Sequence, residues 1–133
     1  MKRTLGKTAA IAFAAVGIAL TNTSAYADGS NVTAWTQQDS SGTAGGGVTF
    51  KPYGEHLYIE DSVANSESVV AHIQYGSKDQ WWFNSGGAGT THHLDLDIAE
   101  GTEVAVAACR GHWKGSVAES EIWACGIWRV TTA

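Results

Sequence analysis

Short alternating runs of apolar and polar residues recur along the chain after residue 28, and almost no segment has helical periodicity. The runs are rich in β-branched and aromatic residues and are separated by Gly, Asn, Asp and Ser, which is typical of strands joined by turns. About seven or eight strands at a spacing of eight to twelve residues predict a single antiparallel β-sandwich of the immunoglobulin-like or jelly-roll type. The predicted strands cover residues 31–37, 48–50, 56–61, 68–75, 80–83, 91–98, 103–110 and 120–130.

The first 27 residues have the pattern of a secretory signal peptide. Three basic residues precede or flank the start of an apolar run over residues 8–20, and the sequence AYA at 25–27 provides a cleavage site of small residues. The apolar run is too short to span a bilayer. We therefore expect residues 28–133 to be exported as one soluble domain.

Removal of this leader makes the remaining chain strongly acidic. The whole chain has 8 basic and 13 acidic residues, and three of the basic ones lie in the leader, so the mature balance is 5 − 13 = −8 over 133 − 27 = 106 residues. Nucleic acids and anionic membrane surfaces both attract Lys and Arg. The charge therefore argues against nucleic acid and membrane as partners and leaves an extracellular protein or a carbohydrate.

Cys109 and Cys125 are the two cysteines of the chain, and both lie in the part expected to be exported. In an oxidising compartment an even pair of cysteines predicts a disulfide bond. On the chain-entropy relation, a bridge that closes a loop of this length stabilises the fold by roughly 3 kcal/mol.

The disulfide also predicts the register of the last two strands. If the cysteines face each other across an antiparallel pair, Val104 lies opposite Val130 and Val106 lies opposite Trp128, on one apolar face. The segment 111–120 then forms a long hairpin loop at one end of the sandwich.

His93, Asp95 and Asp97 alternate with apolar residues and so share one face of their strand. Alternation alone predicts that this polar face is simply in water. The alternative is a cation site, in which carboxylates bind an ion such as calcium. A transition metal would need a further ligand from a neighbouring strand, for instance His72 or His56. Of these interpretations we favour the strand whose polar face is in water, so we predict no metal ligand and no cofactor.

Aromatic residues are abundant for a domain of this size, with six tryptophans in the chain. Trp81 and Trp82 are adjacent and point to opposite faces of a strand, so one of them can be exposed. In the hairpin loop, His112, Trp113 and Lys114 place a ring donor, a flat aromatic and a cation side by side. Exposed Trp faces suit sugar rings and protein hot spots. We predict a binding site that includes these three residues and Trp82; the alternative is that Trp113 folds back over the end of the sandwich.

The chain has neither a G-x-S-x-G nucleophile elbow nor an H-E-x-x-H zinc signature. We therefore predict no catalytic residue. The leading hypothesis is a secreted, non-enzymatic interaction module that binds a protein or a glycan through loops at one end of the sandwich. The alternatives are an inhibitor of an extracellular hydrolase, which would present the 111–120 loop, and a small metal-assisted hydrolase.

Three stretches of the chain also have a recognisable pattern: FKPYGEHLYIED at 50–61, GGAGT at 86–90 and EGTEVAVAAC at 100–109, followed by GIWRV. They resemble the small secreted proteins that are abundant in filamentous actinobacteria, in which a Y/N-G-E segment precedes an Asp, an E-G turn and two cysteines near the C-terminus. The resemblance spans most of the mature chain. It implies secretion and an all-β fold, and it implies no reaction.

Overall fold

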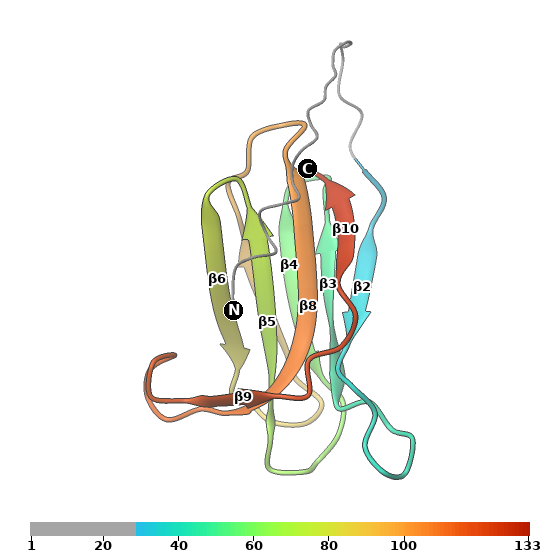
Figure 1. The fold of residues 1–133 in the computed structure, drawn as a ribbon, viewed down its shortest axis with the longest axis vertical. Coiled ribbons are helices and arrows are strands. Elements are labelled where there is room, and N and C mark those ends of the chain that lie inside the picture. Colours follow the sequence, from blue (N-terminus) through green and yellow to red (C-terminus); the bar gives the residue numbers. More distant parts are fainter. Residues whose placement is uncertain (1–28) are drawn as a thin grey trace.

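Two antiparallel sheets pack face to face in the computed structural model, which describes residues 29–133 (Figure 1). The first sheet has the strand order β2-β3-β4-β7, and the second has the order β10-β8-β5-β6, with β9 also paired to β8. The predicted signal peptide, residues 1–27, lies outside the described residues. The strands are β2 (Val32–Trp35), β3 (Gly46–Lys51), β4 (His56–Asp61), β5 (Ser68–Tyr75), β6 (Lys78–Asn84), β7 (Thr91–Asp95), β8 (Glu103–His112), β9 (Glu121–Trp123) and β10 (Arg129–Thr132).

This arrangement confirms the predicted all-β sandwich. Between residues 29 and 133 no helix forms, and so none is long and apolar enough to cross a membrane. The hairpins β3–β4 and β5–β6 belong to different sheets, and β7 and β8 then add to β4 and β5 respectively. Consecutive strands therefore pass from one sheet of the sandwich to the other.

Inward-facing side chains of both sheets form one continuous apolar core. The strands over 56–61 and 68–75 have the bounds predicted from alternation, because one face of each is buried and period two then marks every second residue. The side-chain amide of Asn84 also joins the sheets, since Nδ2 donates to the carbonyl oxygen of Ile59 at 2.9 Å. Fully or almost fully buried members of the core are Ala34, Val48, Phe50, Leu57, Ile59, Val69, Ala71, Ile73, Ile98, Val104, Val106, Ala108 and Ala133.

Arg110 is a buried cation at one end of the sandwich, with 9% of its surface exposed. Its Nη2 donates to the backbone carbonyl oxygens of Gln37 and Thr43, each at 3.1 Å. Its Nη1 lies 3.3 Å from the carboxylate of Glu67. One side chain of β8 therefore holds two separate loops against the sandwich.

The predicted disulfide between Cys109 and Cys125 is present. Cys109 is fully buried in β8, whereas Cys125 is exposed in the connection between β9 and β10. The bridge therefore ties that connection to the sheet that contains β8. A disulfide is consistent with an oxidising environment of the extracellular type.

The predicted register of the last two strands is wrong by one residue. Val106 lies opposite Arg129 and not Trp128. Val104, which is fully buried, does not face Val130, because Val130 pairs with the next residue of β8 and is 54% exposed. The apolar face predicted for this pair of strands is therefore made by β8 without Val130.

The register differs because the predicted strand over 120–130 is interrupted. The five residues 124–128 lie opposite only three residues of β8, between the β9 pairing and the β10 pairing. Ala124 has a φ of 55°, outside the extended region. The amide of Gly126 donates to the carbonyl oxygen of Ala108 at 2.9 Å, and a Cβ at Gly126 would clash with the carbonyl oxygen of Trp35. The backbone of Trp35 approaches Gly126 closely at this point, where the regular hydrogen-bond ladder between β8 and the last strand is interrupted.

Candidate functional site

The β8–β9 hairpin carries three of the four predicted binding residues at one end of the sandwich. In Figure 1 it runs across the lower ends of β5 and β6. β8 continues through His112, so the loop between the strands covers 113–120 and is shorter than predicted. The loop is folded on itself: the hydroxyl of Ser120 accepts from the amide of Lys114 at 2.9 Å and donates to the carbonyl oxygen of Ser116 at 2.6 Å. These two hydrogen bonds hold the loop in shape, although its residues do not pack in the core.

An open groove of about 460 Å³ lies against this hairpin. Its lining comes from the segment that leads into β5, from the residue after β6 and from the hairpin itself. Six of the seven lining side chains are polar, and the seventh is the indole of Trp113. We call this feature the hairpin groove; its lining residues are Ser66, Ser68, Ser85, His112, Trp113, Lys114 and Glu121.

Glu121 is the acidic residue of the hairpin groove. It lies directly opposite His112 in the β8–β9 pairing, and its two carboxylate oxygens are 3.4 Å from His112 Nδ1 and 3.5 Å from Lys114 Nζ. The hydrogen bond from His112, followed by the positive charge of Lys114, lowers the pKa of Glu121 below its usual value. The groove therefore presents a carboxylate that stays ionised, beside a cation and an imidazole.

Trp113 both packs on the domain and remains accessible. Its ring lies 5.1 Å from the ring of Phe83, centroid to centroid, at an interplanar angle of 53°. It is nevertheless 43% exposed. Trp113 is thus neither fully exposed nor fully folded back on the domain: part of its ring covers the outer face of β6, and the rest lines the groove.

The structure does not bring Trp82 to the hairpin groove. Trp82 packs against the core from the inner face of β6, whereas Trp81 lies on the opposite face, as predicted for adjacent strand residues. The Trp81 ring stacks on His72 with 3.6 Å between ring centroids. Nε2 of His72 lies 2.6 Å from the carboxylate of Asp79. Burial lowers the pKa of His72, and the hydrogen bond to Asp79 opposes this shift without cancelling it.

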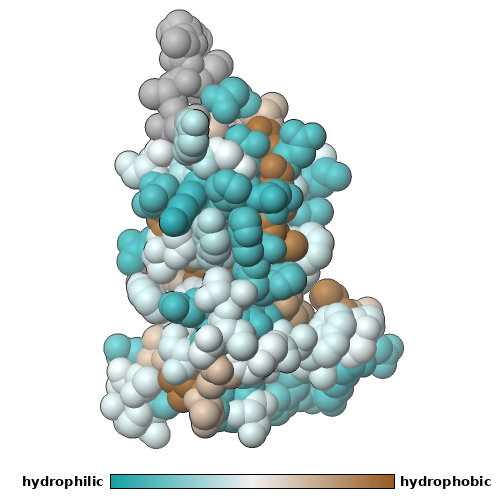
Figure 2. All heavy atoms as spheres, turned by 180° about the vertical axis from the view of Figure 1, so that it is seen from behind, coloured by the Kyte–Doolittle hydropathy of each residue, from teal (hydrophilic) through white to brown (hydrophobic). Residues whose placement is uncertain are grey.

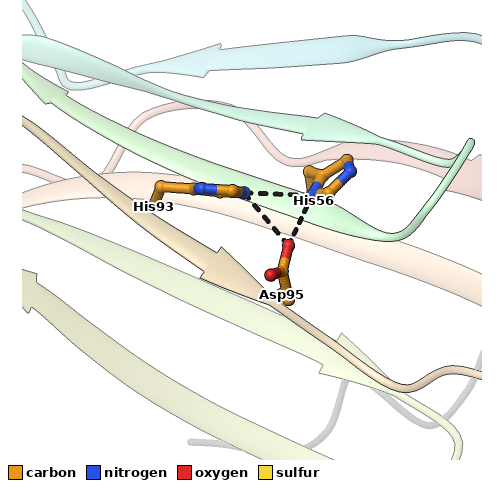
Figure 3. A group of neighbouring side chains, drawn as sticks. All are labelled: His56, His93 and Asp95. Atoms are coloured by element: carbon orange, nitrogen blue, oxygen red, sulfur yellow. Dashed lines mark hydrogen bonds and ion pairs between the residues drawn. The ribbon is translucent and has the colours of Figure 1, made fainter.

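A second group of polar side chains lies on the outer face of the four-stranded sheet. His93 and Asp95 share one face of β7, and His56 lies directly opposite Asp95 on β4. His56 Nδ1 is 2.6 Å from Asp95 Oδ1 and 3.0 Å from His93 Nε2, and the last two atoms are 3.2 Å apart (Figure 3). We call these three residues the His–Asp cluster. Figure 2 shows that hydrophilic side chains gather over the upper part of this face.

The His–Asp cluster decides between the two partner histidines proposed from the sequence. His56 joins His93 and Asp95, whereas His72 lies on the outer face of the other sheet, against Trp81. Asp97 lies beyond the end of β7 and is not part of the cluster. The polar face of this strand is also largely in water, as alternation predicted.

Comparison of the chain with protein-family models, with curated proteins and with solved structures found no match. The resemblance to small secreted actinobacterial proteins therefore stays a prediction.

Proposed function

We propose that this protein is a secreted, non-enzymatic binding module that holds a glycan in the hairpin groove. The observation that carries the proposal is the half-exposed ring of Trp113 at the edge of a groove whose other lining residues are polar. The N-terminal sequence pattern supports secretion, and the disulfide is of the kind that persists outside the cytosol.

The chemistry of the lining favours a sugar over an apolar ligand. A sugar ring has an apolar face of C–H groups, which packs on a flat indole, and a rim of hydroxyls, which need hydrogen-bond partners. Trp113 supplies the flat surface, and Glu121 and Lys114 supply an acceptor and a donor on the same groove. The serine hydroxyls can both donate and accept.

The fixed positions of these groups also favour binding. The loop of the hairpin is closed on itself by the bonds of Ser120, and the disulfide ties the chain beyond β9 to β8. Side chains that are already ordered lose less conformational entropy when a ligand arrives. The groove is thus suited to a ligand that offers many weak polar contacts.

The test is affinity electrophoresis and calorimetry of the mature protein against cellulose, chitin, xylan, mannan and peptidoglycan fragments. We expect saturable binding to at least one of them, and Trp113→Ala should lower its affinity by about 30-fold or more, which corresponds to roughly 2 kcal/mol. About half of the Trp113 ring is buried, so the same substitution should lower the free energy of unfolding by only about 1–1.5 kcal/mol. The variant should therefore remain folded.

Trp35→Ala is the matched control. Trp35 is also a half-exposed tryptophan, but it lies on β2, in the other sheet, and does not line the groove. Its substitution should leave glycan affinity unchanged. Equal losses for the two variants, or no binding to any polysaccharide of the panel, would show that the proposal is wrong.

A further inference from the structure

We propose that the His–Asp cluster is a binding site for one divalent transition-metal ion, with Zn²⁺ as the reference ion. His56 Nδ1, His93 Nε2 and Asp95 Oδ1 are the three ligand atoms. The proposal does not depend on the hairpin groove, because the His–Asp cluster and the groove share no residue.

Strand pairing brings the three residues to one face, and the orientation of their side chains brings their polar atoms together. Residues two apart on a strand are about 7 Å apart, and directly opposite residues have Cβ atoms about 5 Å apart. Exposed side chains at such positions commonly extend into water. Here all three polar atoms lie between 2.6 and 3.2 Å from one another, so the side chains turn toward a common point (Figure 3).

No placement of the ring protons makes all three contacts of this triangle good hydrogen bonds. The ionised carboxylate of Asp95 only accepts, so each ring nitrogen must carry a proton to bond with it. The two protonated nitrogens of His56 and His93 then face each other at 3.0 Å with no acceptor between them. If either nitrogen is unprotonated, it directs a lone pair at the carboxylate instead. A cation among the three atoms accepts a lone pair from each and removes the conflict.

The spacing and the donor types match a transition metal. Two ligand atoms at 2.0–2.1 Å from a metal ion, at angles of about 90–110°, lie roughly 2.8–3.4 Å apart. Two of the three separations, 3.0 and 3.2 Å, fall in this range, and the third, 2.6 Å, needs only a small opening. Two imidazoles and one carboxylate are a ligand set for zinc and related ions, whereas calcium takes six to eight oxygen atoms.

Neighbouring residues hold the two rings in place. Tyr58 lies opposite His93 in the β4–β7 pairing, and their rings stack with centroids 4.5 Å apart and an angle of 7° between the planes. A Cβ at Gly54, which has a φ of 82°, would lie 2.7 Å from Nε2 of His56, so the ring packs directly over this glycine. Lys51 lies with Nζ 5.0 Å from the centre of the Tyr58 ring.

The site would be open to solvent. The side chains of His93 and Asp95 are 42% and 71% exposed. Three protein ligands leave at least one position of a tetrahedral zinc ion for water or another molecule, which is the arrangement of sites that exchange ligands. The cluster is thus expected to bind the ion reversibly and not to be required for folding.

The test is calorimetric titration of the metal-free, disulfide-bonded protein with ZnCl₂. We expect one Zn²⁺ per chain, and His93→Ala and Asp95→Asn should each lower the affinity by at least about 100-fold, more than is usual for the loss of an outer-shell partner. The matched controls are the neighbouring residues: His92→Ala and Asp97→Asn should change the affinity by less than about threefold, because neither belongs to the cluster.

Nuclear magnetic resonance gives a second readout that does not depend on affinity. The chain has five histidines, and addition of Zn²⁺ should shift the imidazole signals of His56 and His93 while leaving those of His72 and His92 in place. Circular dichroism checks that each variant is folded. No saturable Zn²⁺ binding, binding that the control variants weaken equally, or displacement of Zn²⁺ by equimolar Ca²⁺ would overturn the proposal.

Discussion

Removal of the Cys109–Cys125 bridge is the perturbation whose size the structure sets most directly. Cys109 is fully buried and Cys125 is exposed, so the double variant Cys109→Ala, Cys125→Ser keeps an apolar group inside and a polar group outside. The bridge spans a sequence separation of 16 residues. For a loop of that length the chain-entropy relation gives about 10 cal/mol/K, or about 3 kcal/mol at 25 °C.

Two backbone hydrogen bonds hold the bridged connection independently of the disulfide. The amide of Gly126 donates to Ala108, and the amide of Gln37 donates to the carbonyl oxygen of Ala124. The native connection should therefore keep its place without the disulfide, and most of the loss should come from the larger entropy of the unfolded chain. We expect the double variant to fold and to lose about 3 kcal/mol in free energy of unfolding.

Urea denaturation of the oxidised protein, of the protein with dithiothreitol and of the double variant measures this loss. The reduced protein and the variant should have similar midpoints, well below that of the oxidised protein, and larger m-values because an uncrosslinked chain exposes more surface on unfolding. A loss below about 1 kcal/mol would refute the entropic argument. A variant far less stable than the reduced protein would show instead that packing around Cys109 dominates.

Two further predictions concern buried titratable or charged groups. Arg110→Met should lower the free energy of unfolding by about 3–5 kcal/mol, because it leaves Glu67 and two backbone carbonyl oxygens without their donor. Chemical denaturation measures this loss, and a loss under about 1 kcal/mol would contradict the role assigned to Arg110. Burial lowers the pKa of His72 in the folded protein. As the pH drops below about 6.5, the unfolded chain therefore takes up a proton at this residue before the folded protein does, and the free energy of unfolding decreases. His72→Phe keeps a ring against Trp81 and should remove this part of the loss between pH 7 and pH 5, as followed by melting temperature; an unchanged pH profile contradicts it.

Strands whose one face is buried could be predicted from the sequence with little error. The bounds of β4 and β5 follow from the alternation of apolar residues, because every second side chain enters the core. The interruption of the last strand could not be predicted in the same way. It depends on Ala124 at a positive φ, which alanine rarely adopts, and on the contact between Gly126 and the backbone of Trp35, which is remote in sequence.

The sequence does not predict that Glu121 lines the hairpin groove, because it places His112 in the loop 111–120 and not in a strand. In the structure β8 continues through His112, and Glu121 lies opposite it. Composition alone could predict that the loop residues His112, Trp113 and Lys114 lie together, since they are consecutive, but not which carboxylate joins them.

The His–Asp cluster was half predictable for a related reason. Period two places His93 and Asp95 on one face whatever the fold. The third ligand depends on which strand lies beside β7, and the sequence offered both His56 and His72. That choice is made by the exchange of strands between sheets, in which β7 returns to β4 and leaves β5 to pair with β6 and β8.

The strand directions also separate the two proposed sites in space. His56 begins β4, and the other end of β4, at Asp61, connects through a short loop to Ser68 at the hairpin groove. Five steps of about 3.3 Å along β4 and the roughly 10 Å between packed sheets therefore lie between the cluster and the groove. Substitutions that far apart, with no shared partner, act additively. Loss of metal binding in Asp95→Asn and loss of glycan binding in Trp113→Ala are thus separate observations, and the failure of either proposal leaves the other standing.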